Sequence, residues 1–276
     1  MDHQQINHSV IYAIEVVGYF VDRTLNHPVF ITLIGPIAAA FFGTWGAQKL
    51  AERQARRKEL ILQINGINLA IAYTVGIVQT FINFKKQIVL PTSNEYKKTV
   101  SERNAFLTSK SDSIPPKFHC ILKMKNFHSV WTPIEDLKGI FSSKFVANSN
   151  SLLLLVRLSE FITILNEFLL QRNDFISEYR KMPMSEDDKA SLYFGELISR
   201  GHIDERYKNL MKIIPETTDD CIGFAVVLYE TLYQIGTKAS AQLKKRGLHV
   251  YKTEFLYKEL IPDLEKYYPL TGKNQN

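Results

Sequence analysis

The sequence predicts an all-α protein with one N-terminal transmembrane helix, on three observations. Residues 29–47 form an uncharged apolar run that ends at a cluster of basic residues. Beyond that cluster, apolar residues recur at spacings of three and four, which is typical of an amphipathic helix. Long helix-periodic segments then fill residues 151–276, with few strand-like runs. We therefore expect a transmembrane helix, a long amphipathic stalk helix and a cytoplasmic helical bundle with an irregular insertion.

The composition of the 276-residue chain is ordinary for a protein with an apolar core, at 45% hydrophobic and 22% charged residues. The net charge of +6 is modest and partly concentrated between Lys49 and Lys58, so nucleic acid is not an expected partner. Only two cysteines, Cys120 and Cys221, are present, which excludes a disulfide framework. We expect no cofactor and no bound metal.

Residues 1–28 form a short N-terminal segment in which apolar side chains surround Glu15. The stretch from Ser9 to Val21 is shorter than the roughly 20 residues that a helix needs to cross a bilayer, which favours an interfacial helix. If the segment enters the bilayer instead, Glu15 is an intramembrane carboxylate and the candidate pore-lining residue.

Residues 29–48 are predicted to form the transmembrane helix. The 19 residues from Val29 to Ala47 carry no formal charge. The alternative is a core helix of a soluble domain, although uninterrupted apolar runs of this length are uncommon there. Small side chains recur at every fourth position of the run, on one helical face where another backbone can approach closely. These candidate helix-packing residues are Gly35, Ala39, Gly43 and Ala47.

The basic cluster that follows the apolar run predicts the orientation of the chain. Arg23 is the only lysine or arginine before the run, whereas five follow it within ten positions. The positive-inside rule then places the N-terminus outside and the C-terminal domain in the cytoplasm of a single-pass inner-membrane protein. The same five side chains are candidates for contact with anionic lipid head groups: Lys49, Arg53, Arg56, Arg57 and Lys58.

Residues 49–90 are predicted to comprise this basic stop and the amphipathic stalk helix. Residues 64–84 also lack charge, so a second transmembrane span is an alternative; the Asn and Gln residues within them count against it, because unpaired amides are costly in lipid. The apolar stripe of the predicted stalk consists of Leu60, Ile64, Ile67, Ile71, Val75, Val78 and Ile82.

The remaining two segments are an irregular insertion and a helical bundle. Residues 91–150 contain Pro91 and polar stretches such as TSKSDSIPP, which predict irregular structure. Residues 151–276 are expected to form the cytoplasmic bundle. Its helices are predicted from Leu152 to the residue before Pro183, from Ser185 to Gly201 with Asp188 in a capping box, from near Thr217 to Gly247, and over residues 252–268.

No catalytic signature is present. The sequence lacks the motifs GxxxxGK[ST], GxGxxG, HExxH, GxSxG and paired CxxC. The neighbouring His119 and Cys120, with His128, lack a second pair of ligands for zinc. These observations favour a protein that is not an enzyme.

The order of the parts resembles the membrane-anchored accessory and effector proteins found beside bacterial anti-phage and CRISPR systems. The resemblance is one of architecture and rests on GPIAAAFFGTWGAQKLAERQARRKELILQINGINLAIA, residues 35–72. It implies an oligomer whose membrane segments open or perturb the inner membrane when the cytoplasmic domain receives a signal from a partner protein. Two alternatives stay open: a membrane scaffold that recruits a soluble partner, and a membrane-tethered, nuclease-like helical domain.

Overall fold

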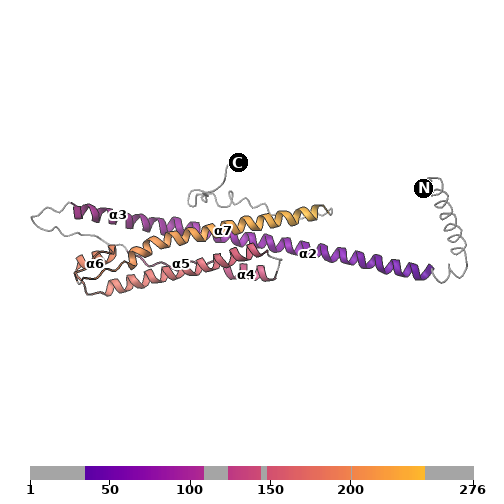
Figure 1. The fold of residues 1–276 in the computed structure, drawn as a ribbon, viewed down its shortest axis with the longest axis horizontal. Coiled ribbons are helices and arrows are strands. Elements are labelled where there is room, and N and C mark those ends of the chain that lie inside the picture. The colour runs from indigo at the N-terminus through magenta and orange to yellow at the C-terminus, as the bar shows by residue number, and fades with distance from the viewer. Residues whose placement is uncertain (1–34, 109–123, 144–147, 200, 246–276) are drawn as a thin grey trace, which may run out of the picture. The chain divides into compact units, whose positions relative to one another are not determined.

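The computed structural model describes residues 35–108, 124–143, 148–199 and 201–245 (Figure 1). These residues are mostly helical, as predicted, and hold no β-strand, only an isolated bridge between Leu197 and Ile203. Glu15, residues 29–34 of the predicted membrane helix, Cys120 and residues 252–268 lie outside them. The elements are α2 (Gly35–Phe84), the π-helical turn η2 (Lys85–Val89), α3 (Leu90–Thr108), α4 (Ile134–Ser143), α5 (Ser149–Lys181), α6 (Glu186–Phe194) and α7 (Arg206–Lys244).

The chain divides into two compact units, Met1–Glu59 and Leu60–Asn276. In the first unit the described residues are the N-terminal half of α2. Every side chain described there is exposed.

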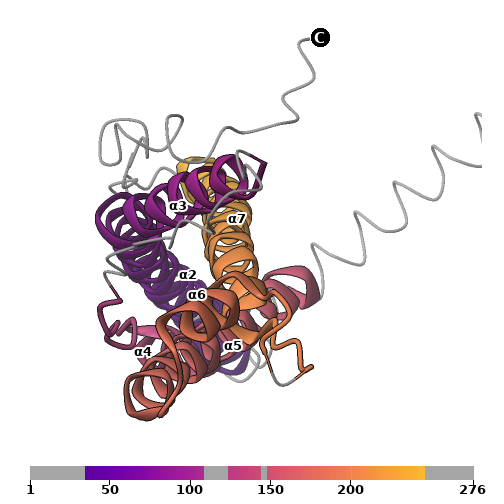
Figure 2. The same cartoon turned by 90° about the vertical axis from the view of Figure 1, so that its left-hand side faces the viewer.

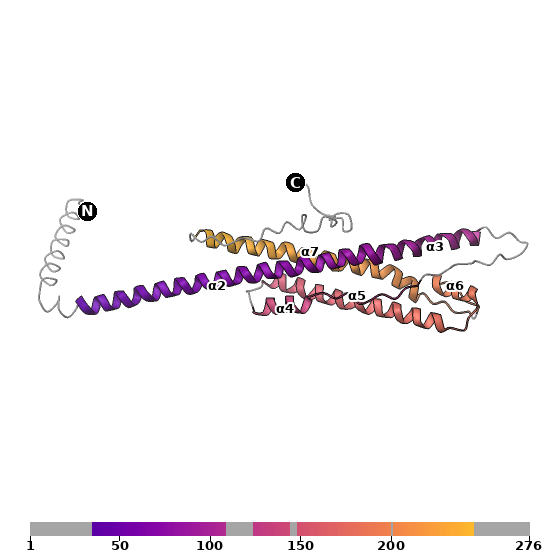
Figure 3. The ribbon, with the colours of Figure 1, turned by 180° about the vertical axis from the view of Figure 1, so that it is seen from behind.

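The second unit has one main apolar core, shared by α2 beyond residue 60, α4, α5 and α7. The helices α5 and α7 run antiparallel beside each other, with α6 at the end where they are connected (Figures 1 and 3). Viewed along its length, α4 and α5 lie on one side of the unit and α3 on the other (Figure 2). The structure buries six of the seven residues of the α2 stripe and leaves Leu60 partly exposed; the six are Ile64, Ile67, Ile71, Val75, Val78 and Ile82.

One continuous helix, from Ala39 to Thr108, is long and apolar enough to cross a membrane. Half of its most apolar window is buried inside the protein. Because residues 39–59 are all exposed and Ile64 is the first buried residue of this helix, that window lies beyond residue 60, in the predicted stalk. Core helices of soluble proteins meet the same criterion of length and composition, so this criterion does not single out residues 29–48 as the membrane span.

The prediction that residues 91–150 are irregular throughout is wrong, because they include α3 and α4. The misleading residue is Pro91, which lies in the first turn of α3. Proline lacks an N–H and its ring collides with the carbonyl four residues back. Just before Pro91 the helix widens into η2, where the Leu90 N–H donates to the carbonyl oxygen of Lys85, five residues back. This π-helical turn carries the helix past the proline.

The prediction for α5 is confirmed, since the helix ends at Lys181, two residues before Pro183. The predicted cap of α6 is also confirmed, because the Asp188 N–H donates to Ser185 Oγ over 3.1 Å. Its predicted end at Gly201 is wrong: Gly195 takes up a left-handed conformation with φ 67° and closes the helix.

The predicted start of α7 near Thr217 is wrong as well, because the helix begins at Arg206 and contains Pro215. On the far side of this proline, the hydroxyls of Thr217 and Thr218 donate to the carbonyl oxygens of Ile213 and Ile214, at 2.9 and 2.7 Å. These bonds satisfy the buried hydroxyls within the helix. Tertiary packing of the first two turns therefore outweighs the local preference of proline to end a helix.

The core assignment predicts unequal effects for two leucines of α5. Leu165 is fully buried, whereas Leu170 is 60% exposed. We expect Leu165→Ala to lower the free energy of unfolding by about 2–5 kcal/mol, because apolar contacts are lost and a cavity remains. Leu170→Ala should stay within about 0.5 kcal/mol of the parent. Urea unfolding of the full chain in detergent, followed by circular dichroism, measures both, and equal losses would contradict the assignment.

Candidate functional site

Three cationic side chains are buried among the described residues: Lys85, Arg103 and Arg172. Removing a charge from water is costly unless an opposite charge or hydrogen bonds compensate for it. The partners of these three side chains therefore indicate which of them have a purely structural explanation.

Lys85 and Arg103 each pair with a carboxylate from another part of the helical unit. Lys85 Nζ lies 2.5 Å from Asp219 Oδ1, which connects η2 to α7. Arg103 Nη2 lies 3.0 Å from Glu196 Oε2, which connects α3 to the segment after α6. Both pairs tie the α2–α3 helix to its neighbours, and a structural role accounts for them.

Arg172 differs, because it forms no ion pair with any residue that the structure describes. Its Nη1 donates to the carbonyl oxygen of Lys125 over 2.6 Å, and its Nη2 makes a long contact of 3.4 Å with the Tyr207 hydroxyl. Its Nε has no acceptor among the residues that the structure describes. The guanidinium carbon lies 3.7 Å from the centre of the Phe127 ring, a cation–π contact. Burial lowers the pKa of Arg172, against the opposing influence of Tyr207.

The irregular segment 124–133 is held against α5 by side chains spaced seven residues apart on that helix. The Asn173 amide accepts from the Phe127 N–H over 2.8 Å and donates to its carbonyl oxygen over 2.6 Å. Asn166 makes the same pair of bonds with Val130. Arg180 donates to the Met124 carbonyl oxygen over 2.7 Å. These bonds satisfy backbone N–H and carbonyl groups of a segment that belongs to no helix. They also place Lys125 and Phe127 beside Arg172.

A pocket of about 470 Å³ opens beside Arg172. Its walls come from three places in the chain: η2 with the start of α3, the segment 124–133, and α5. The lining residues are Gln87, Ile88, Pro91, Thr92, Glu95, Lys125, Asn126, Phe127 and Arg172.

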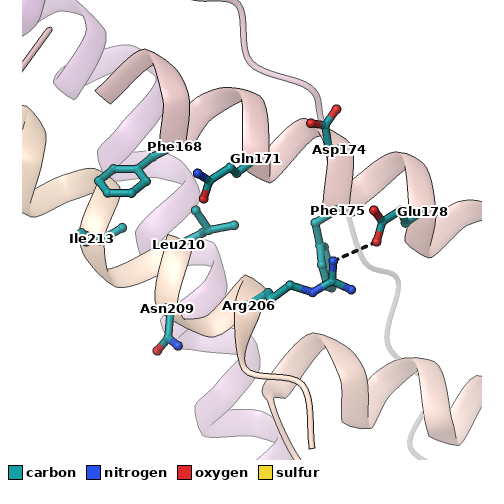
Figure 4. Close-up of a pocket in the computed structure, with 9 residues that line it drawn as sticks. All are labelled: Phe168, Gln171, Asp174, Phe175, Glu178, Arg206, Asn209, Leu210 and Ile213. Atoms are coloured by element: carbon teal, nitrogen blue, oxygen red, sulfur yellow. Dashed lines mark hydrogen bonds and ion pairs between the residues drawn. The ribbon is translucent and has the colours of Figure 1, made fainter. Parts of the chain in front are cut away.

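A second pocket, also of about 470 Å³, lies between α5 and α7 (Figure 4). Its arginine, Arg206, is already neutralised by two carboxylates: Glu178 Oε2 and Asp204 Oδ2 each lie 2.9 Å from its guanidinium nitrogens. The hydrogen bond to Asp204 raises the pKa of Arg206. Burial opposes ionisation of Asp204, yet the bonds from Arg206 outweigh it and lower the pKa of that carboxyl.

Tyr207 connects the Arg172 pocket to an aromatic cluster. Its ring centroid lies 4.8 Å from that of Tyr193, 5.2 Å from that of Phe175 and 5.9 Å from that of Tyr96. Burial raises the pKa of Tyr207, so its hydroxyl is neutral at physiological pH and supplies no counter-charge to Arg172.

The residues predicted for membrane contact lie on the exposed half of α2. Apart from the backbone of its own helix and its two chain neighbours, no described residue has an atom within 4 Å of the place where a Cβ on Gly43 would stand. Ala39 and Ala47 are exposed, and Gly35 is the first residue of the helix. The five predicted lipid-contacting cations are exposed too. Lys49 Nζ lies 3.8 Å from Glu52 Oε2 and 6.0 Å from the centre of the Trp45 ring.

Neither a metal centre nor a reactive thiol is found in the part of the chain that the structure describes. No group of three or more His, Cys, Asp or Glu side chains there could hold a metal ion. Cys221 is fully buried, and burial raises the pKa of its thiol, which therefore stays protonated and unreactive. Two features are left to interpret: the exposed half of α2 and the Arg172 pocket.

Comparisons of the chain with protein-family models, with curated proteins and with solved structures find no match.

The pairing of Lys85 predicts different losses of stability when two adjacent carboxyls of α7 are replaced. Asp219→Asn removes the counter-charge of a buried ammonium and should lower the free energy of unfolding by about 1–3 kcal/mol. At Asp220, burial and then the charges of Asp219 and Glu216 raise the carboxyl pKa, so the folded state disfavours its charge.

Asp220→Asn is therefore the matched control and should cause no loss of stability at pH 7. Urea unfolding of both variants measures the difference. A larger loss in Asp220→Asn than in Asp219→Asn would contradict the role assigned to the Lys85 pair.

Proposed function

We propose that the protein is a membrane-anchored, non-enzymatic, oligomeric effector whose N-terminal segments permeabilise or depolarise the inner membrane. The observation that carries this proposal is the exposed half of α2. Between Ala39 and Glu59 no described side chain is covered by the protein, although four of them are large and apolar. These are Phe41, Phe42, Trp45 and Leu50, each more than half exposed. Contiguous apolar surface of this kind is unusual in water and typical of contact with a membrane or a partner.

The small residues of α2 support self-association. In lipid, helices associate through close packing rather than hydrophobic exclusion, and small side chains let two backbones approach. Ala39, Gly43 and Ala47 lie along one face, and no side chain among the described residues fills the space beside Gly43. That face is therefore available to another copy of the helix.

The basic cluster supports both the orientation and the membrane contact. Cations just beyond an apolar segment favour the cytoplasmic side, and each one near anionic lipid contributes on the order of 1 kcal/mol of attraction. The order of apolar surface, then Trp45 and Lys49, then the remaining cations follows the change from hydrocarbon to head groups.

The helical unit is the part that receives the signal in this proposal. A signal can shift a closed-to-open equilibrium only by binding the two states with different affinities. The role in anti-phage defence is part of this proposal and rests on the architectural resemblance of residues 35–72.

A membrane scaffold is the second candidate function, supported by exposed apolar residues on α5. Leu152, Leu153 and Val156 lie in its first turns and are 50%, 56% and 45% exposed. A recruited protein that covers this patch would give the helical unit a docking role in place of a gating role. A scaffold would be harmless when produced alone, which separates it from the effector.

We expect Gly43→Leu to abolish both assembly and depolarisation, because the new side chain stands where another backbone would approach. Membrane potential in live bacteria on induced expression, with crosslinking of the membrane fraction, measures both effects. The control is Phe41→Leu, on the opposite face of the same helix, which should behave as the parent. Glu15→Gln, measured alongside, tests the candidate pore-lining carboxylate. Depolarisation by a monomeric Gly43→Leu at equal membrane level would refute the assembly model.

The orientation predicts the behaviour of a reporter fused after Asn276. Alkaline phosphatase, which is active only outside the cytoplasm, should be inactive there in the parent chain. Replacing the five cations between Lys49 and Lys58 by glutamine should give measurable phosphatase activity, because the charge asymmetry that sets the topology is lost. High activity already in the parent would reverse the proposed orientation.

A further inference from the structure

The contrast among the three buried cations shows that one charge has no counter-charge among the described residues. Lys85 and Arg103 have carboxylate partners, whereas Arg172, the most deeply buried of the three, has a backbone carbonyl, a distant phenol and an aromatic face. A guanidinium offers five N–H donors in a planar fork that matches an oxyanion. In Arg172, Nε has no acceptor among the described residues.

The pocket beside Arg172 presents donors and polar groups at its rim. Gln87 and Asn126 contribute amides, Thr92 a hydroxyl, and Lys125 an exposed ammonium. Glu95 is the one carboxylate in the lining; it is exposed and forms no ion pair with Arg172. Apolar contacts from Ile88 and Phe127 complete the walls. A few convergent polar groups within partly apolar walls are typical of small-molecule sites, and about 470 Å³ lies in the size range of such sites.

We propose that this pocket binds a small molecule carrying an anionic oxygen group, either a carboxylate or a phosphate, which pairs with the Arg172 guanidinium. The anion supplies the counter-charge that none of the described residues supplies, and Lys125 at the rim adds a second cation. The remainder of the ligand lies against Ile88 and Phe127. This site is independent of the proposed membrane function, since all of its residues belong to the helical unit.

The second pocket makes a matched comparison. It has the same volume and also contains an arginine, but two carboxylates already neutralise Arg206. Figure 4 shows the bond to Glu178, and Asp204 is the second carboxylate. An incoming anion would have to displace those carboxylates. Charge compensation by the described residues, rather than the presence of an arginine, therefore distinguishes the two pockets.

The site also includes the π-helical turn η2, which supplies Gln87 and Ile88 to its wall. Such turns inside α-helices are frequent at functional sites. A ligand bound at Arg172 would contact α5 and the α2–α3 helix together, whereas the Lys85–Asp219 pair connects that helix to α7.

The test measures binding of inorganic phosphate and of acetate to the purified full chain in detergent, by calorimetric titration at constant ionic strength set with sodium chloride. We expect saturable binding of at least one of the two probes, and the tighter probe identifies the oxyanion class. Arg172→Gln should weaken binding about tenfold or more, because the charge-assisted pair is lost. Arg206→Gln, the matched control, should bind as the parent does.

A second variant tests the site without removing a buried residue. Asn126 is exposed at the rim, so Asn126→Trp should leave the fold intact by circular dichroism and obstruct the pocket. It is expected to lose binding with Arg172 still present. Absence of binding of both probes to the parent chain would overturn the proposal, and so would equal affinity in the parent, in Arg172→Gln and in Asn126→Trp.

Discussion

The described helical unit depends on the packing of α5 and α7 against each other and against the apolar stripe of α2. The approach is close at Gly236, where a Cβ would lie 3.2 Å from Ile67 Cγ2. Because these helices share one core, their position decides where every other group lies. The ion pairs of Lys85 and Arg103, the hydrogen-bonded segment 124–133 and the pocket beside Arg172 all require that core to be formed first.

Features that depend on one helix alone were predictable from the sequence. The stripe of α2, the end of α5 before Pro183 and the cap at Ser185 are local signals, read from side-chain spacing and capping chemistry. Pro91 misled the prediction, because it indicated the start of an irregular segment, and the predicted start of α7 fell two residues after Pro215. In the structure a π-helical turn accommodates Pro91, and tertiary packing keeps α7 helical around Pro215.

For the same reason, the sequence predicts one of the two candidate sites and not the other. The small residues and the cations of α2 are visible as a linear pattern. The Arg172 pocket was missed, because its walls come from three separate segments that only the fold brings together. One signal was present: buried residues of α5 recur at spacings of four and three, and position 172 falls on that stripe. An arginine at a core position of a helix indicates a compensating group elsewhere. The stripe positions around it are Leu158, Ile162, Leu165, Leu169, Arg172 and Ile176.

The π-helical turn also sets a rotational phase within the long α2–α3 helix. Each residue of an α-helix advances the side-chain direction by about 100°, so one additional residue in a turn re-aims everything that follows it. The orientation of Arg103 toward Glu196 is thus set by the width of the turn at Lys85–Val89, some four helical turns earlier. Narrowing that turn to α-helical geometry would rotate α3 about its own axis while leaving α2 in place. A shift of one hydrogen-bond register at η2 would therefore change the direction in which every side chain of α3 points.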